Sequence, residues 1–109
     1  MVQVDVIFLI AKSWRKNEKT GKMEATEYRK KVFAEIDAIN QAEFYSAAQA
    51  GLKAAFKATV FGGDYSGEEL VEWKGKRYAV YRQYSGRGKY KDSVRGDYIE
   101  LYVREEAGI

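Results

Sequence analysis

In the absence of histidine and cysteine, a carboxylate-only site is the acid-base or metal chemistry that this sequence could support. The chain contains 16 Asp and Glu residues, but no histidine and no cysteine. Thiolate nucleophiles, imidazole bases and the usual zinc, copper or haem ligands are therefore missing. A hydrolase would need a carboxylate pair or a magnesium site, for which Asp64 and Glu68 are the residues to test. No supporting base or electrophile is placed with them, so we predict no catalytic residue, no metal and no cofactor, and expect a protein that is not an enzyme.

A basic and aromatic segment after Trp73 could contact a nucleic acid. Its cations could bind phosphates while the interleaved tyrosines stack on bases, and the cations of interest are Arg77, Arg82, Arg87 and Lys89. A solvated hairpin with tyrosines on a sheet surface explains the same pattern and is favoured. The net charge of +3 is too small to indicate a DNA-coating protein by itself. A small nucleic-acid-binding β-barrel stays open as the alternative function.

The elements that would position these residues belong to one domain, residues 1–109. With 46% apolar and 15% aromatic residues, a chain of 109 residues can bury a single core. Its apolar start lacks a cationic leader and a cleavage site, and no apolar run approaches the about 18 residues needed to cross a bilayer. We expect a protein of a soluble compartment without a membrane partner.

Hydrophobic periodicity predicts a mainly β fold. Period-two alternation and turn glycines indicate six strands, near residues 2–14, 28–36, 56–61, 69–73, 76–84 and 97–105. Lys74-Gly75 is predicted to be a tight hairpin turn. The polar stretches 15–27 and 85–96 are predicted to be a long mobile loop and a basic loop. The pattern favours a small six-stranded antiparallel β-barrel or rolled sheet, with one short α-helix after the second strand.

The helix is predicted at residues 41–50. Asn40 is suited to cap its start, and Glu43 can reach back to complete a capping-box-like pair. Gly51 stands where a left-handed C-cap belongs. We expect these three residues to serve the fold first, and Phe44 and Leu52 to serve packing.

Several segments, in order, resemble the signature of phage head-tail joining proteins, also called head closure or head-tail adaptor proteins. The segment from Ile39 to Lys53 carries most of the likeness, through its Glu-Phe-Tyr and Gly-Leu-Lys pieces. The likeness continues through residues 64–68 and 73–82 and ends at 97–101, so it spans roughly residues 28 to 103. Relatives often have Pro-Glu after Gly-Leu-Lys, whereas this chain has Ala54-Ala55, and its loop 86–96 looks longer than usual. Both departures concern loop geometry.

The resemblance implies a compact barrel with one short helix and a structural role in the virion of a tailed bacteriophage. Such a subunit assembles into a ring, usually dodecameric, beneath the portal and adaptor proteins, although it can be monomeric when isolated. The ring completes the head, closes the capsid exit and offers the docking surface for the tail and its completion protein, while genome DNA passes without sequence-specific binding. Its expected location is the head-tail junction, and the host cytoplasm during viral assembly.

Ring assembly would require unlike patches on one subunit that join neighbour to neighbour. We hypothesise that these ring contacts come from the helix and the residues after it, namely Phe44, Tyr45, Gln49, Leu52 and Lys53. The competing explanation is that the helix only caps an open end of the barrel. We further hypothesise that the polar stretch 16–27 becomes ordered on assembly.

Overall fold

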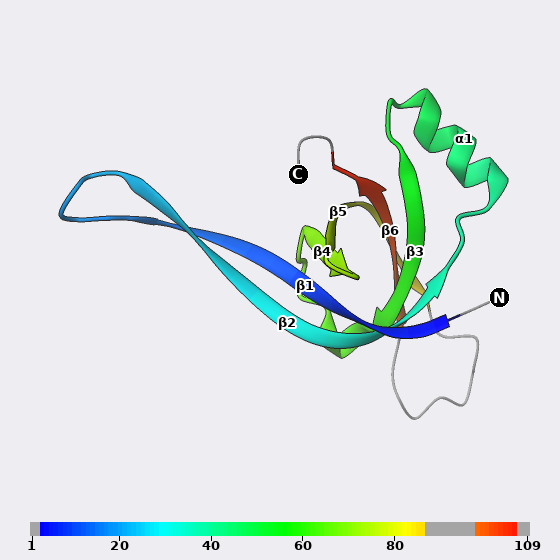
Figure 1. The fold of residues 1–109 in the computed structure, drawn as a ribbon, viewed down its shortest axis with the longest axis horizontal. Coiled ribbons are helices and arrows are strands. Elements are labelled where there is room, and N and C mark those ends of the chain that lie inside the picture. The colour runs from blue at the N-terminus through cyan, green and yellow to red at the C-terminus, as the bar shows by residue number, and fades with distance from the viewer. Residues whose placement is uncertain (1–2, 87–97, 107–109) are drawn as a thin grey trace.

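The computed structural model describes residues 3–86 and 98–106. Six strands and one α-helix account for most of this part of the chain (Figure 1). The elements are β1 (Gln3–Lys16), β2 (Met23–Asp37), α1 (Gln41–Gln49), β3 (Ala54–Phe61), a short 3-10 turn η1 (Gly62–Asp64), β4 (Leu70–Trp73), β5 (Lys76–Gly86) and β6 (Tyr98–Glu105). In the described residues, no helix is long and apolar enough to cross a membrane.

The six strands form one antiparallel sheet that closes on itself. Their order is β1-β2-β3-β6-β5-β4, and β4 pairs back with β1 through residues 8–10 of β1. The predicted fold class, a small six-stranded antiparallel sheet rolled into a ring with one helix after the second strand, is confirmed. Because the ring closes, the strands have no free edge within it.

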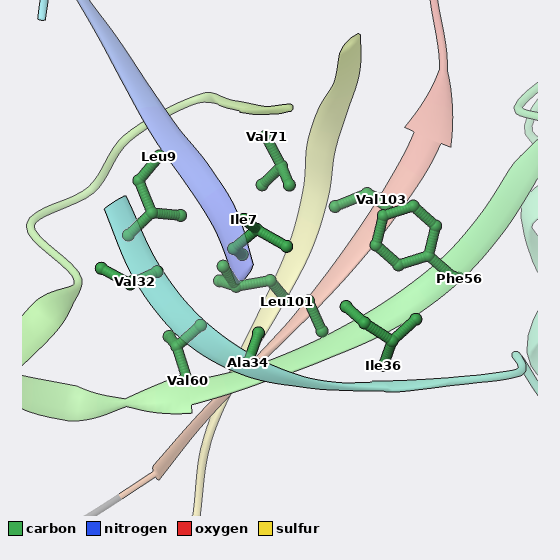
Figure 2. Close-up of a cluster of buried hydrophobic side chains, with 11 residues drawn as sticks. Ile7, Leu9, Val32, Ala34, Ile36, Phe56, Val60, Val71, Leu101 and Val103 are labelled. Atoms are coloured by element: carbon green, nitrogen blue, oxygen red, sulfur yellow. The ribbon is translucent and has the colours of Figure 1, made fainter. Parts of the chain in front are cut away.

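The core fills the inside of this closed sheet (Figure 2). Alternate residues of β3 and β6 point inward as the periodicity predicted, and Phe56 alone contacts both Trp73 and Tyr78, with ring centroids 4.9 and 4.7 Å away. In β1 the inward residues are Ile7 and Leu9, which are fully buried. The members of the buried cluster are Ile7, Leu9, Val32, Ala34, Ile36, Phe56, Ala58, Val60, Val71, Leu101 and Val103.

The predicted mobile loop at residues 15–27 is wrong. β1 continues to Lys16 and β2 begins at Met23, so the two strands pair along their whole length and leave only residues 17–22 as a turn. The Asn17 side chain holds this turn, because its Oδ1 accepts the backbone N–H of Lys19 at 2.9 Å and its Nδ2 donates to Glu24 at 2.8 Å. Ladder hydrogen bonds therefore order a stretch whose composition had indicated a loop.

The hairpin turn at Lys74-Gly75 is confirmed. Both residues have positive φ, 51° and 78°, which is the combination that a two-residue turn between twisted strands requires. The basic loop predicted at residues 85–96 is shortened at its start, because β5 extends to Gly86. Residues 87–96 of that prediction lie outside the described part of the chain.

Candidate interaction surfaces

Asn40 and Gly51 cap α1 as the sequence predicted. The Asn40 side chain accepts the backbone N–H of Glu43 at 2.8 Å. At the other end, Gly51 has a φ of +78°, and the N–H of Leu52 donates to the carbonyl of Ala47 at 2.9 Å. This pattern is a Schellman motif, in which glycine supplies the left-handed residue. Local structure therefore supplies hydrogen bonds at both ends of the helix. The observed helix, Gln41–Gln49, differs from the predicted one by one residue at its end.

The Glu43 carboxylate does not turn back to complete a capping box. It binds β5 instead: Oε1 accepts the Tyr81 hydroxyl at 3.0 Å, and Oε2 accepts Arg82 Nη1 at 2.9 Å. Burial, and then the Glu43 hydrogen bond, raise the pKa of Tyr81 to about 12. The correction has a simple cause, since two good donors on β5 outcompete one backbone N–H for the same carboxylate. Glu43 thereby ties the helix to the sheet.

Most of the helix surface faces solvent, where a partner could reach it. Tyr45 and Gln49 are exposed, and Phe44 is 44% exposed, so the expectation that Phe44 serves packing is wrong. Phe44 and Tyr45 contact each other edge to face, with ring centroids 6.2 Å apart. Leu52 is half-buried. Lys53 forms an ion pair with Glu105 at 3.2 Å. The predicted ring contacts thus lie together around one helix, although only part of the set is free to bind.

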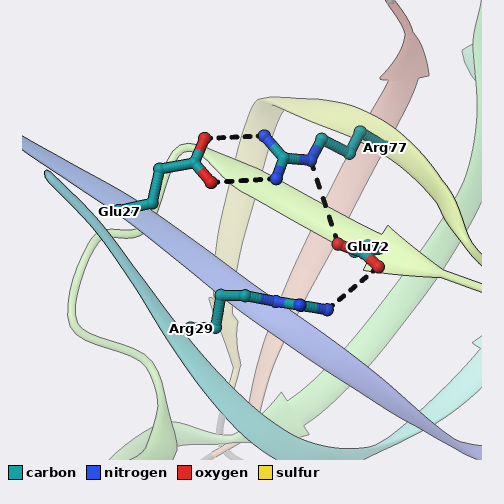
Figure 3. Close-up of polar contacts among 4 residues, drawn as sticks. All are labelled: Glu27, Arg29, Glu72 and Arg77. Atoms are coloured by element: carbon teal, nitrogen blue, oxygen red, sulfur yellow. Dashed lines mark hydrogen bonds and ion pairs between the residues drawn. The ribbon is translucent and has the colours of Figure 1, made fainter. Parts of the chain in front are cut away.

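Where the structure describes them, the cations proposed to face DNA form ion pairs with carboxylates. Arg77 forms a bidentate ion pair with Glu27, at 2.7 and 2.9 Å, and its Nε lies 3.8 Å from Glu72 (Figure 3). Glu72 also accepts a hydrogen bond from Arg29. These four residues join β2 to the β4-β5 hairpin on the outer face. Arg82 is paired with Glu43, as described above. Arg87 and Lys89 lie outside the described residues.

The long β1-β2 hairpin extends well beyond the closed sheet (Figure 1). β1 pairs with β4 only at residues 8–10, so residues 11–28 form a two-stranded ribbon, which we call the arm. Trp14 and Met23 are 62% and 59% exposed on one face of the arm, with Lys12 and Lys16 on the same face by alternation. No described carboxylate lies within ion-pair distance of either lysine. A tryptophan and a methionine that are more than half exposed on a projecting ribbon are typical of a contact surface.

A second exposed apolar surface lies on the outside of the closed sheet. Val6 is opposite Phe33 on β2, Phe61 is opposite Tyr98 on β6, and the β2-β3 register brings Phe33 beside Phe61. Phe33 is 72% exposed and Phe61 40%. A shallow depression of ≈ 470 Å³ lies along this row, which we call the outer groove; it is lined by Val4, Phe33, Ala34, Glu35, Thr59, Phe61, Asp64 and Tyr98.

The local chain geometry places the Phe61 ring in this groove. A Cβ built on Gly63 would lie 2.7 Å from the Phe61 ring, so the ring occupies space that any other residue at position 63 would fill. The glycine in η1 therefore lets Phe61 lie close against the backbone that follows it. This is a role for one of the glycines that the sequence marked only as breaking a strand.

The two acidic residues considered for a hydrolase do not form a common site. Glu68 is buried, accepts the backbone N–H of Ser66 at 2.8 Å and lies 3.4 Å from Lys30 Nζ, so local structure accounts for it. Asp64 lines the outer groove instead. Within residues 3–86 and 98–106, no cluster of three or more potential metal ligands occurs.

Sequence reasoning missed four of the large apolar side chains that the structure leaves exposed, Trp14, Met23, Phe33 and Phe61. For Phe33 a signal was available, because it is the apolar member of a face that otherwise carries Arg29, Lys31 and Glu35. No protein-family model matches this chain, and no match was found among curated proteins. The comparisons therefore identify no class of protein, and the function has to be argued from the two surfaces.

Proposed function

We propose that this protein is a structural subunit that assembles into a ring, as a head-completion or head-tail joining protein of a tailed bacteriophage. Two lines of argument support the proposal. One is the ordered likeness of residues 39–53, 64–68, 73–82 and 97–101 to that family. The other is the presence of unlike exposed surfaces on one small subunit, which is what closed cyclic assembly needs.

The observation that carries the proposal is the arm. A two-stranded ribbon outside a closed sheet contributes little to the core, yet it holds Trp14 and Met23 in water. In Figure 1 the arm and α1 extend from different sides of the closed sheet. A subunit of this shape can reach one neighbour with its arm while presenting its helix to another. The portal, the adaptor, the tail-completion protein and the passing genome are the partners that the proposal implies.

The proposal is tested in the particle itself. The gene is deleted from the phage that encodes it, and lysates are examined by electron microscopy for full heads, leaking heads and unattached tails. We expect heads without tails and loss of packaged DNA, both restored by the wild-type chain supplied from a plasmid. Normal tailed particles from the deletion strain, or absence of the chain from the junction of wild-type particles, would reject the function.

The nucleic-acid-binding alternative is tested separately, by titrating the purified chain with single-stranded and duplex DNA at rising salt. Because Arg77 and Arg82 are paired with carboxylates, the described cations that have no ion pair are mainly those of the arm, namely Lys12, Arg15, Lys16, Lys19 and Lys22. Weak binding that hardly changes with salt would argue against this alternative, whereas a steep salt slope would favour it.

A further inference from the structure

We propose that the arm of one subunit docks in the outer groove of a second copy of this chain, and that this contact joins neighbours in the ring. The inference rests on the proposed function for its biological setting, but the contact itself is argued from the two surfaces. Each is apolar and exposed, each is built on ladder-paired strands, and they lie on different parts of the subunit.

The arm is a ridge and the outer groove is a depression, so their shapes are complementary. The arm presents a narrow ridge, with Trp14 opposite Ala25 on the neighbouring strand and Met23 two residue pairs further along on the same face. The groove offers a depression of ≈ 470 Å³ with aromatic walls from Phe33 and Phe61. A large aromatic side chain entering an apolar recess is the usual centre of a protein interface. The arm therefore supplies the anchor that the groove can receive.

The charges around the two surfaces are opposite in sign. Lys12 and Lys16 flank Trp14 on its face of the arm, and the acid on that face, Glu27 opposite Lys12, is paired with Arg77. Glu35 and Asp64 are the ionisable acids of the groove, and neither forms an ion pair with a described residue. Contact between arm and groove would place lysines beside acids, while contact between two arms or two grooves would bring like charges together. Electrostatics thus favours a second copy bound head to tail over a symmetric pair.

As a rigid ribbon, the arm cannot reach its own groove, because the two lie at different ends of the β1-β2 hairpin. Its base is held on the outer face by the Glu27-Arg77 pair and by Arg29 with Glu72 (Figure 3), and the arm extends away from the closed sheet (Figure 1). The groove lies on the same sheet but at the start of β1 and the end of β3, at Val4 and Phe61. A neighbouring subunit is the occupant that this geometry allows.

The contact can be tested by cysteine cross-linking, because the chain has no cysteine of its own. Ala25→Cys marks the Trp14 face of the arm, and Thr59→Cys marks the groove beside Glu35. The two single variants are mixed at increasing concentration under a mild oxidant, and disulfide-linked dimers are measured. Thr26→Cys is the matched control, since it adjoins Ala25 but points to the opposite face of the arm.

We expect the Ala25→Cys and Thr59→Cys mixture to form the linked dimer at least 10-fold faster than the Thr26→Cys control. Adding Trp14→Ala to the arm variant should slow the reaction about 30-fold, as expected for loss of an interface anchor. Cross-linking reads even a sparsely populated contact, so a mixture that reacts no faster than its control overturns the inference. Faster linking of Ala25→Cys to itself would instead show pairing of two arms and would also overturn it.

A mixing experiment then tests direction. Trp14→Ala removes the arm's anchor, and Phe33→Ser removes a wall of the groove. Each variant alone should lose self-association, whereas their mixture should recover a one-to-one complex, because one intact arm and one intact groove remain. Recovery of larger assemblies by the mixture, or of none, contradicts a head-to-tail contact. If cross-linking fails while the chain still occupies the head-tail junction, the inference falls and the function stands. If cross-linking occurs but the chain is absent from the junction, the proposed function falls and the contact between copies stands.

Discussion

Excision of the arm should leave the closed sheet folded. The perturbation deletes residues 14–25 and joins Ser13 to Thr26, which are opposite each other in the ladder, through an Asn-Gly turn. This turn type has positive φ at both central residues, as Lys74 and Gly75 have in the native β4-β5 turn. The cut keeps Glu27 and Arg29, so the ion pairs at the base of the arm remain.

The expected change in stability is small because none of the deleted residues is buried. An isolated two-stranded hairpin is marginally stable at best, so the arm should add or subtract no more than about 1 kcal/mol from the free energy of unfolding. For a domain of this size, that corresponds to a change in Tm of less than about 8 °C. Leu101→Ala is the comparison variant: its side chain is fully buried, and its truncation should destabilise the fold by about 2–5 kcal/mol.

Chemical denaturation followed by tryptophan fluorescence measures both variants in one assay. After excision, Trp73 is the one tryptophan left, because the chain contains two. Its indole N–H donates to Asp5 Oδ2 at 2.9 Å and so reports the contact between β4 and β1 that closes the sheet. A loss of stability as large as that of Leu101→Ala, or an altered Trp73 emission in the folded state, would refute the claim that the arm lies outside the cooperative core.

Three further predictions concern single residues. Glu43→Gln removes a charge that favours neutral Tyr81, so the pKa of Tyr81 should fall below about 12 in an NMR titration of tyrosine ring carbons, yet stay above 10.0 because burial is the larger cause. In the wild type, the stability that this tyrosine contributes should be intact below pH 10.0 and lost as the pH rises toward about 12, since the folded state favours the protonated form. Gly51→Ala should destabilise the protein by about 1 kcal/mol in thermal unfolding, because φ is +78° there, while Ala48→Gly on the exposed helix face controls for helix propensity. The Arg77 hydrogen bond holds the pKa of Glu27 below 4.5, so its contribution to stability should be present above pH 4.5 and decline as the pH falls below it; Glu27→Gln should flatten that part of the acid-unfolding curve, and an unchanged curve would contradict the pairing.

The strands, the helix and its caps could be predicted from sequence because their signals are local. Alternation in β3 and β6 marks the inward face directly, and Asn40 and Gly51 bracket α1 at the expected spacing. The Lys74-Gly75 turn is equally local. Each of these signals involves residues close in the chain, so no knowledge of the tertiary fold was needed to interpret them.

The arm could not be predicted in the same way, because a ribbon exposed on both faces has no hydrophobic alternation to detect. Residues 15–27 are mostly charged or small, and a loop has the same composition. What makes them strands is the register carried outward from the base of the hairpin, where Ile7, Leu9 and Val32 are buried, together with the Asn17 turn. The structure of the arm is thus a consequence of long-range pairing at its base.

The same reasoning explains why the partners of charged residues escaped prediction. Glu43 and Arg82 are far apart in sequence, as are Glu27 and Arg77, and only the closed sheet brings each pair together. Arg77 and Arg82, which the sequence offers as free phosphate contacts, are paired with carboxylates, while Lys16, in a segment predicted to be a loop, lies with Lys12 on an ordered face beside Trp14. The closed sheet therefore moves the most plausible binding surface from the basic hairpin to the arm and the outer groove, and a functional test directed only at Arg77 and Arg82 would examine residues that already have partners.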